Sequence, residues 1–181
     1  MKKGIKIGAW IVLLLIIFYT SFDLGKNYGK KHIVVVHTTK EQKGVYTWML
    51  AKSEMPEATI QTVYDTALKY DNADLILAII KTESNFNPFA KSHGNAIGLM
   101  GIIPSWWSKE LIEQKIIKSK RDLYDIEKNI RAGNYILTKY FGTYKNIDLT
   151  LEKYSGNAKG YSHKVFVALG EINYARMKGT W

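Results

Sequence analysis

The chain has 181 residues, a length that suits one domain with an added segment, and its formal net charge at pH 7 is +10. It contains no cysteine, which excludes disulfides, a lipid-modified cysteine and thiolate metal sites. Residues 1–43 carry +6 of the charge, and residues 44–181 carry only +4. No nucleic-acid-binding motif accompanies the basic segment, so we expect no nucleic-acid partner.

The N-terminal residues 1–24 predict a membrane helix. Two lysines follow Met1, and an apolar run then extends from Ile7 to Phe22. A small-x-small cleavage site is missing after the run, which favours an uncleaved signal anchor over a cleaved secretory signal or a buried soluble helix. The basic start favours a cytoplasmic N-terminus, which places the rest of the chain outside the membrane. The lysine-rich residues 25–44 are expected to form a basic linker.

Residues 45–181 predict a compact, mainly α domain. Apolar residues recur at helical spacing from Ile60 to Leu68. The next helix, capped by Asp71 or Asn72, contains the run 75–80, which is apolar on every side and is therefore expected in the core. Further helices are expected from Ser105 or Ser108 onward, from Asp125 to Tyr140, from Asp148 to about Gly156, and from Ser162 to about Met177.

Glu83 is the candidate general acid. It stands three residues after the end of the apolar run, and Pro88 then stops the helix. Burial without a neighbouring cation raises the pKa of a glutamate, so its carboxyl can stay protonated near neutral pH and donate to a leaving oxygen. An isolated glutamate is usually solvated, so the residues around Glu83 decide between the two interpretations.

Those residues form three motifs in a fixed order. The motifs are Glu83-Ser84-x-Phe86-Asn87-Pro88 with Ala90, Ser92, Gly94, Ala96, Gly98-Leu99-Met100 and Pro104; Asn129-Ile130-x-Ala132-Gly133-x-Tyr135-Ile136-Leu137; and Tyr154-Ser155-Gly156. Together they closely resemble the lytic transglycosylases of the soluble (SLT), goose-lysozyme-like family, over roughly residues 55–170. The resemblance implies a lysozyme-like fold, in which a cleft separates helical lobes.

The resemblance also implies an enzyme that cleaves the MurNAc-β-1,4-GlcNAc bond of peptidoglycan glycan strands and leaves 1,6-anhydroMurNAc ends. Glu83 would act first as acid and then as base, without a cofactor or a metal. The resemblance also implies four substrate-binding residues, which are Ser92, Met100, Ile102 and Tyr154. Met100 and Ile102 would form an apolar wall of the cleft. Tyr154 would in addition form a hydrogen bond with Glu83 that orients its carboxyl. The domain would face the periplasm or cell wall, in wall turnover or in a secretion, conjugation or phage machine.

The chain departs from the family pattern at Gly101, where glutamine is usual. Lys153, Ser155 and Asn157 likewise stand where the cleft motif usually has alanine, asparagine and glycine. A glycine removes a hydrogen-bonding side chain from the cleft, so Gly101→Gln is expected to tighten substrate binding. This expectation holds only if residue 101 has a negative φ.

Two other functions remain open from the sequence. A goose-type lysozyme of the same fold would hydrolyse the glycan and would need a positioned water, with a second carboxylate to activate it. Asp122 and Asp125 are candidates for that carboxylate, although both stand where they would cap a helix. A non-catalytic cell-wall-binding assembly protein would keep the cleft without the activity.

Overall fold

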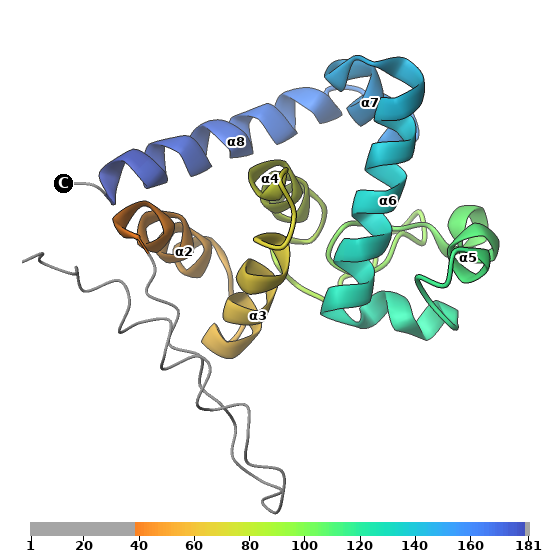
Figure 1. Ribbon diagram of the computed structural model, residues 1–181, viewed down its shortest axis with the longest axis horizontal. Helices are drawn as coiled ribbons and strands as arrows, with labels where there is room; N and C mark the ends of the chain where they lie inside the picture. The colour runs from red at the N-terminus through yellow and green to blue at the C-terminus, as the bar shows by residue number, and fades with distance from the viewer. Residues whose placement is uncertain (1–38, 180–181) are drawn as a thin grey trace, which may run out of the picture. The chain divides into compact units, whose positions relative to one another are not determined.

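The computed structural model describes residues 39–179, and these are mainly helical, as the sequence predicts (Figure 1). Within them the only β pairing is two isolated bridges, which join Ile97 to Lys91 and to Ile102. The helices are α2 (Lys40–Lys52), α3 (Glu57–Ala67), α4 (Ala73–Ser84), α5 (Pro104–Glu113), the 3-10 helix η1 (Lys120–Tyr124), α6 (Ile126–Tyr144), α7 (Ile147–Tyr154) and α8 (Tyr161–Lys178).

The predicted membrane helix of residues 1–24 lies outside the described residues, as does most of the predicted linker. None of the described helices is long and apolar enough to cross a membrane. The predicted linker is too long at its end, because α2 already begins at Lys40. Thr39 and Gln42 cap this helix reciprocally, each side chain accepting from the other's backbone N–H. Residues 40–44 therefore belong to the folded domain.

Helix α4 lies at the centre of the larger core, and α8 packs along both α4 and α2 (Figure 1). The side chains of α4 from Ile76 to Ile80 are all fully buried, which explains why the run has no polar face. Gly44 on α2 lies so close to α8 that a Cβ there would be 2.2 Å from the Ala175 carbonyl oxygen. This close packing joins the first and last described helices.

The turn after α4 fixes the direction in which the chain leaves Glu83. Asn85 and Phe86 both have positive φ, 49° and 68°, a conformation that costs a non-glycine residue free energy. The Phe86 ring is fully buried and meets the Trp48 ring edge-on at 5.7 Å between centroids. Burial of this aromatic side chain offsets the backbone strain.

The side chain of Asn129 in α6 fixes the loop between α4 and α5 by hydrogen bonds to its backbone. The Asn129 side chain is buried; its Oδ1 accepts from the Met100 N–H at 2.8 Å, and its Nδ2 donates to the Leu123 and Ile97 carbonyl oxygens at 2.6 and 3.3 Å. A Cβ on Gly98 would lie 2.1 Å from that same Nδ2. The glycine therefore allows the loop to close onto the amide.

The predicted helix boundaries are confirmed in type, and several are moved by a few residues. Asp125 caps α6 as predicted, accepting from the Lys128 N–H. Helix α7 is capped by Asn146 and not by Asp148, and α8 begins directly after Gly160 and not after Ser162. Gly160 has φ of 74° at the turn into α8, and the helix begins two residues earlier than a cap at Ser162 would allow.

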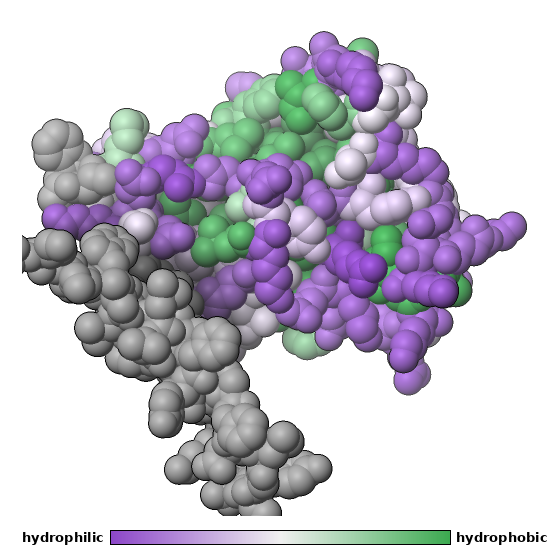
Figure 2. Space-filling model, viewed as in Figure 1, coloured by the Kyte–Doolittle hydropathy of each residue, from purple (hydrophilic) through white to green (hydrophobic). Residues whose placement is uncertain are grey.

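The face of the molecule seen in Figure 2 is mostly hydrophilic, with hydrophobic residues gathered between α8 and α7. An apolar pocket at the junction of α4, α6 and α7 is lined by Leu75, Leu137, Phe141 and Ile147. Phe141 is 45% exposed. This pocket contains no carboxylate, so it is unsuited to acid–base chemistry.

We predict that Asn129→Ala destabilises the domain by about 3 kcal/mol, because it leaves buried backbone groups without partners. The free energy of unfolding from urea titration measures the loss. Arg131→Ala, on the exposed side of the same helix, should change it by less than about 0.5 kcal/mol. Equal stability of the Asn129→Ala and wild-type proteins would show that the loop does not depend on this amide.

Candidate active site

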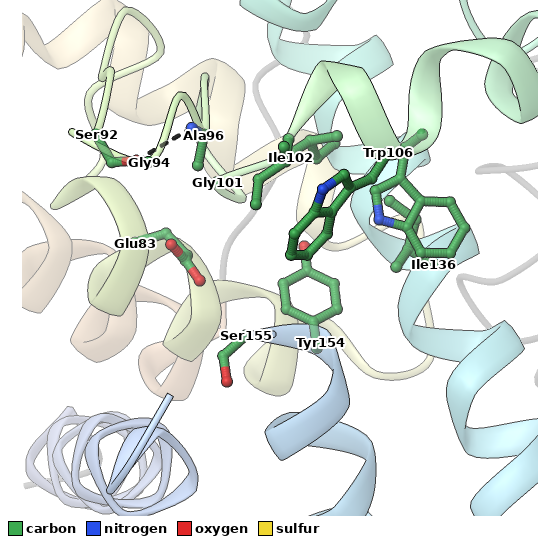
Figure 3. Close-up of a pocket in the computed structure, with 12 residues that line it drawn as sticks. Glu83, Ser92, Gly94, Ala96, Gly101, Ile102, Trp106, Ile136, Tyr154 and Ser155 are labelled. Carbon is green, nitrogen blue, oxygen red and sulfur yellow. Dashed lines mark hydrogen bonds between the residues drawn. The ribbon is translucent and has the colours of Figure 1, made fainter. Parts of the chain in front are cut away.

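A cleft of about 230 Å³ lies between the end of α4, the loop 85–103, α5 and α7 (Figure 3). Glu83 stands on one side of it, and Trp106 and Ile136 stand across from it. Among the residues that the structure describes, Glu83 is the one carboxylate that lines this cleft. The lining consists of Glu83, Ser92, Gly94, Ala96, Gly101, Ile102, Ile103, Trp106, Trp107, Ile136, Tyr154 and Ser155.

The Glu83 carboxylate is partly buried and accepts one hydrogen bond, from the Tyr161 hydroxyl to Oε1 at 2.6 Å. Burial raises the pKa of Glu83 above its ordinary value, and the hydrogen bond from Tyr161 lowers it by a smaller amount. The net rise favours the protonated carboxyl. Burial likewise raises the pKa of Tyr161, so its hydroxyl keeps its proton. The pair therefore has the donor and acceptor pattern that a general acid needs.

Tyr161 is the residue that sequence reasoning missed, and Tyr154 does not have the contact that was predicted for it. The Tyr154 hydroxyl donates to the Met100 carbonyl oxygen at 2.8 Å, so its proton is not directed at Glu83. Tyr154 ends α7 and Tyr161 starts α8, which packs against α4. A glycine before a tyrosine at a helix start was the available sequence signal, but it does not say which helix the ring will face.

The structure places the two residues of the predicted apolar wall differently. Ile102 lines the cleft, but the Met100 side chain is fully buried and is absent from the lining. A Cβ on Gly133 would lie 2.3 Å from Met100 Sδ, so Met100 fills the space that this glycine leaves beneath the loop. Ser92 lines the cleft and is exposed, and its hydroxyl accepts from the Ala96 N–H at 3.1 Å. Its proton remains free to reach a ligand.

The far wall of the cleft is aromatic. Trp106 is 60% exposed, whereas Trp107 is half-buried and meets the Tyr140 ring edge-on at 5.7 Å. The Lys139 ammonium lies 5.5 Å from the Trp107 ring centroid and donates to Glu110 at 2.5 Å. These contacts fix Trp107 against α6 and leave the Trp106 ring available to a sugar face.

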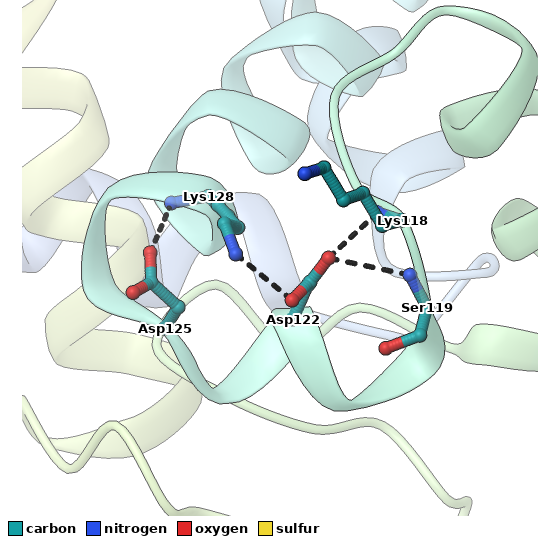
Figure 4. A network of polar contacts seen from close by, with 5 residues as sticks. All are labelled: Lys118, Ser119, Asp122, Asp125 and Lys128. Atoms are coloured by element: carbon teal, nitrogen blue, oxygen red, sulfur yellow. Dashed lines mark hydrogen bonds and ion pairs between the residues drawn. The ribbon is translucent and has the colours of Figure 1, made fainter.

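Asp122 and Asp125 act as caps, as the sequence suggests, and not as cleft carboxylates. Figure 4 shows Asp122 accepting from the Lys118 and Ser119 backbone N–H groups and from the Lys128 ammonium, at 2.6, 3.2 and 2.8 Å. These bonds, above all that from Lys128, lower the pKa of Asp122 to about 2. Residues 39–179 also contain no cluster of potential metal ligands.

The model of the family described as "Transglycosylase SLT domain" matches residues 64–165, more than half of the chain. The chain belongs to this family. The match extends from the end of α3 to the first part of α8 and so includes every residue that lines the cleft. It also supports the prediction that the chain is an enzyme of the lytic transglycosylase class.

Several curated relatives match about a third of this chain. Proteins named membrane-bound lytic murein transglycosylase C from Actinobacillus succinogenes and Haemophilus influenzae are 44% and 47% identical to the chain over 66 and 62 residues. The matches cover 35% and 33% of this chain but only 18% and 17% of those proteins. The chain therefore corresponds to less than a fifth of their length. No solved structure matches the chain significantly.

The raised pKa of Glu83 predicts a pH-dependent stability cost in the SLT domain. The folded state binds the Glu83 proton more tightly than the unfolded state does, so stability falls as pH rises from the unfolded pKa through the higher folded pKa. Each unit of that rise corresponds to about 1.4 kcal/mol. Glu83→Gln removes the titration and keeps an acceptor for Tyr161. The melting temperature of the variant should therefore rise relative to that of the wild type as the pH increases from 4 to neutral. A difference in melting temperature that stays constant with pH would contradict the burial of the charge.

Proposed function

We propose that the chain is a peptidoglycan lytic transglycosylase that cleaves the MurNAc-β-1,4-GlcNAc bond and leaves a 1,6-anhydroMurNAc end. The observation that carries the proposal is a cleft with one carboxylate, Glu83, whose pKa is raised by burial. Hydrolysis with a conventional pair of carboxylates would require a second one across the cleft to activate water. Among the described residues that side is formed by isoleucine and tryptophan instead.

Glu83 supplies both proton transfers. Its protonated carboxyl donates to the glycosidic oxygen while the bond from that oxygen to the muramic anomeric carbon breaks. The substrate's N-acetyl group stabilises the positive charge at that carbon. Glu83, now ionised, takes the proton from the muramic C6 hydroxyl as its oxygen bonds to the anomeric carbon. The nucleophile is intramolecular, so no water is consumed and the carboxyl regains its proton.

Tyr161 supports the ionised form that exists between the two transfers. Its hydroxyl donates to Glu83 Oε1, which stabilises the negative charge that appears after the first proton has left. Burial favours the protonated carboxyl before the reaction, and the hydrogen bond limits the cost of ionisation during it. Burial and the Tyr161 hydrogen bond thus act on the pKa of Glu83 in opposite directions, as suits a group that serves acid and base steps in turn.

Substrate contacts follow from the remaining lining. The Ser92 hydroxyl is free to donate to an N-acetyl or hydroxyl oxygen, and Ile102 offers an apolar contact beside Glu83. The exposed Trp106 ring suits stacking on a sugar. Tyr154 shapes the cleft floor through its bond to the Met100 carbonyl oxygen. Membrane attachment through residues 1–24 is supported by the sequence and by the membrane-bound relatives, and a partner machine stays a prediction.

Glu83→Gln should remove nearly all activity while the domain stays folded, because the amide can neither donate nor take up the proton. The loss should be at least about 10²-fold. The measurement is the release of soluble muropeptides from purified sacculi, with mass analysis of the products. Anhydro products are lighter than hydrolysis products by one water molecule, so reducing ends in their place would identify a lysozyme. Near-normal turnover by the folded variant would overturn the mechanism.

Tyr161→Phe and Tyr154→Phe should act differently. The first removes the hydrogen bond that lowers the pKa of Glu83, so the alkaline limb of the kcat/KM profile should move to higher pH and kcat should fall. The second removes the bond to Met100, so it should lower the melting temperature and leave the limb in place. If Tyr154→Phe moved the alkaline limb and Tyr161→Phe changed only the melting temperature, Tyr154 would be the residue that orients Glu83.

A further inference from the structure

Among the glycines of the described residues, Gly101 is the one where an added Cβ would collide with the Glu83 carboxyl. Its φ is +61°, and a Cβ built on it would lie 2.2 Å from Glu83 Oε2, 2.6 Å from Cδ and 3.1 Å from Cγ. Real Cβ atoms essentially never approach other heavy atoms within 3.0 Å. The carboxyl therefore fills the space that a residue other than glycine would need at position 101.

The loop is the less mobile partner in this contact. Ile97 and Ile102 exchange two backbone hydrogen bonds, of 2.9 and 3.1 Å, on either side of the four-residue turn that contains Gly101. The Met100 N–H donates to the buried Asn129 amide at 2.8 Å. A side chain at 101 would therefore displace the Glu83 carboxyl sooner than the turn. The carboxyl would then move into the cleft and away from the Tyr161 hydroxyl.

We propose that Gly101 is a positioning residue for Glu83. Because Gly101 has no side chain, the carboxyl can lie against the loop backbone, where it accepts the hydrogen bond from Tyr161. The proposal rests on the proposed function, in which Glu83 is the acid. The departure from the family's usual glutamine is then part of how this site is built. Gly101→Gln, expected from the sequence to tighten binding, should instead displace Glu83, because the positive φ and the contact with the carboxyl both exclude a side chain.

The position of the carboxyl against the Gly101 backbone determines how much water and which groups surround it. The titratable groups that face Glu83 are Tyr161 from α8 and Tyr154 from α7, and no cation of the described residues contributes to its ionisation. Burial is the larger influence on this carboxyl and the Tyr161 bond the smaller. A carboxyl displaced into the cleft regains water, so it should ionise more easily even though it loses that bond.

A double-mutant cycle tests the contact without reference to activity. Gly101→Ala introduces both the collision with Glu83 and the strain of an alanine at positive φ. In a Glu83→Ala background the collision is absent and the strain remains. The fall in melting temperature caused by Gly101→Ala should be at least about twofold larger with Glu83 present than without it. Equal falls in the two backgrounds would overturn the proposal, and a Gly101→Ala protein that folds only with Glu83→Ala would support it.

Titration of Glu83 in isotope-labelled protein by NMR tests the consequence. Gly101→Ala should move the Glu83 midpoint to lower pH, and the alkaline limb of the activity profile should move with it. Gly94→Ala is the matched control, because Gly94 also lines the cleft but a Cβ there meets nothing closer than Ser92 Oγ at 3.7 Å. The Glu83 midpoint should stay unchanged in that variant. An unchanged midpoint in folded Gly101→Ala would overturn the proposal.

The two hypotheses fail in different ways. If Glu83 is not the acid, Glu83→Gln keeps its turnover, whatever the cycle and the NMR midpoint show. If Gly101 does not position Glu83, the Glu83→Gln protein is inactive as proposed. The double-mutant cycle then shows no coupling, and Gly101→Ala does not move the titration midpoint of Glu83. The stability and NMR measurements need no substrate, so they decide the role of Gly101 independently of the reaction.

Discussion

The side-chain amide of Asn129 is the constraint on which the rest of the site depends. One buried side chain joins α6 to the Ile97 and Met100 backbones of the loop and to Leu123 at the end of η1. A buried amide satisfied at both ends fixes its partners in position, because any displacement leaves an unpaired polar group in the core. The loop position in turn places the Gly101 backbone against Glu83.

Glu83 itself is fixed from the opposite side by helix packing. Helix α4 is buried from Ile76 to Ile80, its end is closed by the strained Asn85–Phe86 turn, and α8 packs against it. Tyr161, at the first position of α8, reaches Glu83 because the two helices pack together. The site is therefore built where two rigid parts meet: α4 with α8 on one side, and the loop with α6 on the other.

The sequence predicts the elements well and their mutual contacts poorly. The all-apolar run 75–80, the cap at Asp125 and the three ordered motifs locate Glu83 at the end of a core helix, because each depends on residues close together in the chain. The partner of Glu83 lies 78 residues away, and the motif contains a tyrosine, Tyr154, that could equally have been that partner. Only the packing of α7 and α8 decides which hydroxyl faces the acid.

The same limit explains the two other corrections. Met100 is apolar and belongs to the cleft motif, but its side chain occupies the space beside Gly133 in the core. Ile102 lines the cleft instead. The positive φ of Gly101 follows from a turn closed by hydrogen bonds between Ile97 and Ile102.

Both glycines are visible in the sequence, but what each leaves room for is a property of the fold. At Gly133 the space is filled by a methionine, which stabilises the loop. At Gly101 it is filled by the Glu83 carboxyl, where exclusion of water raises the pKa of Glu83 and one hydroxyl limits the rise. In the proposed mechanism a proton donor that must also accept a proton needs both influences, so the missing side chain and the Tyr161 bond would act as a pair.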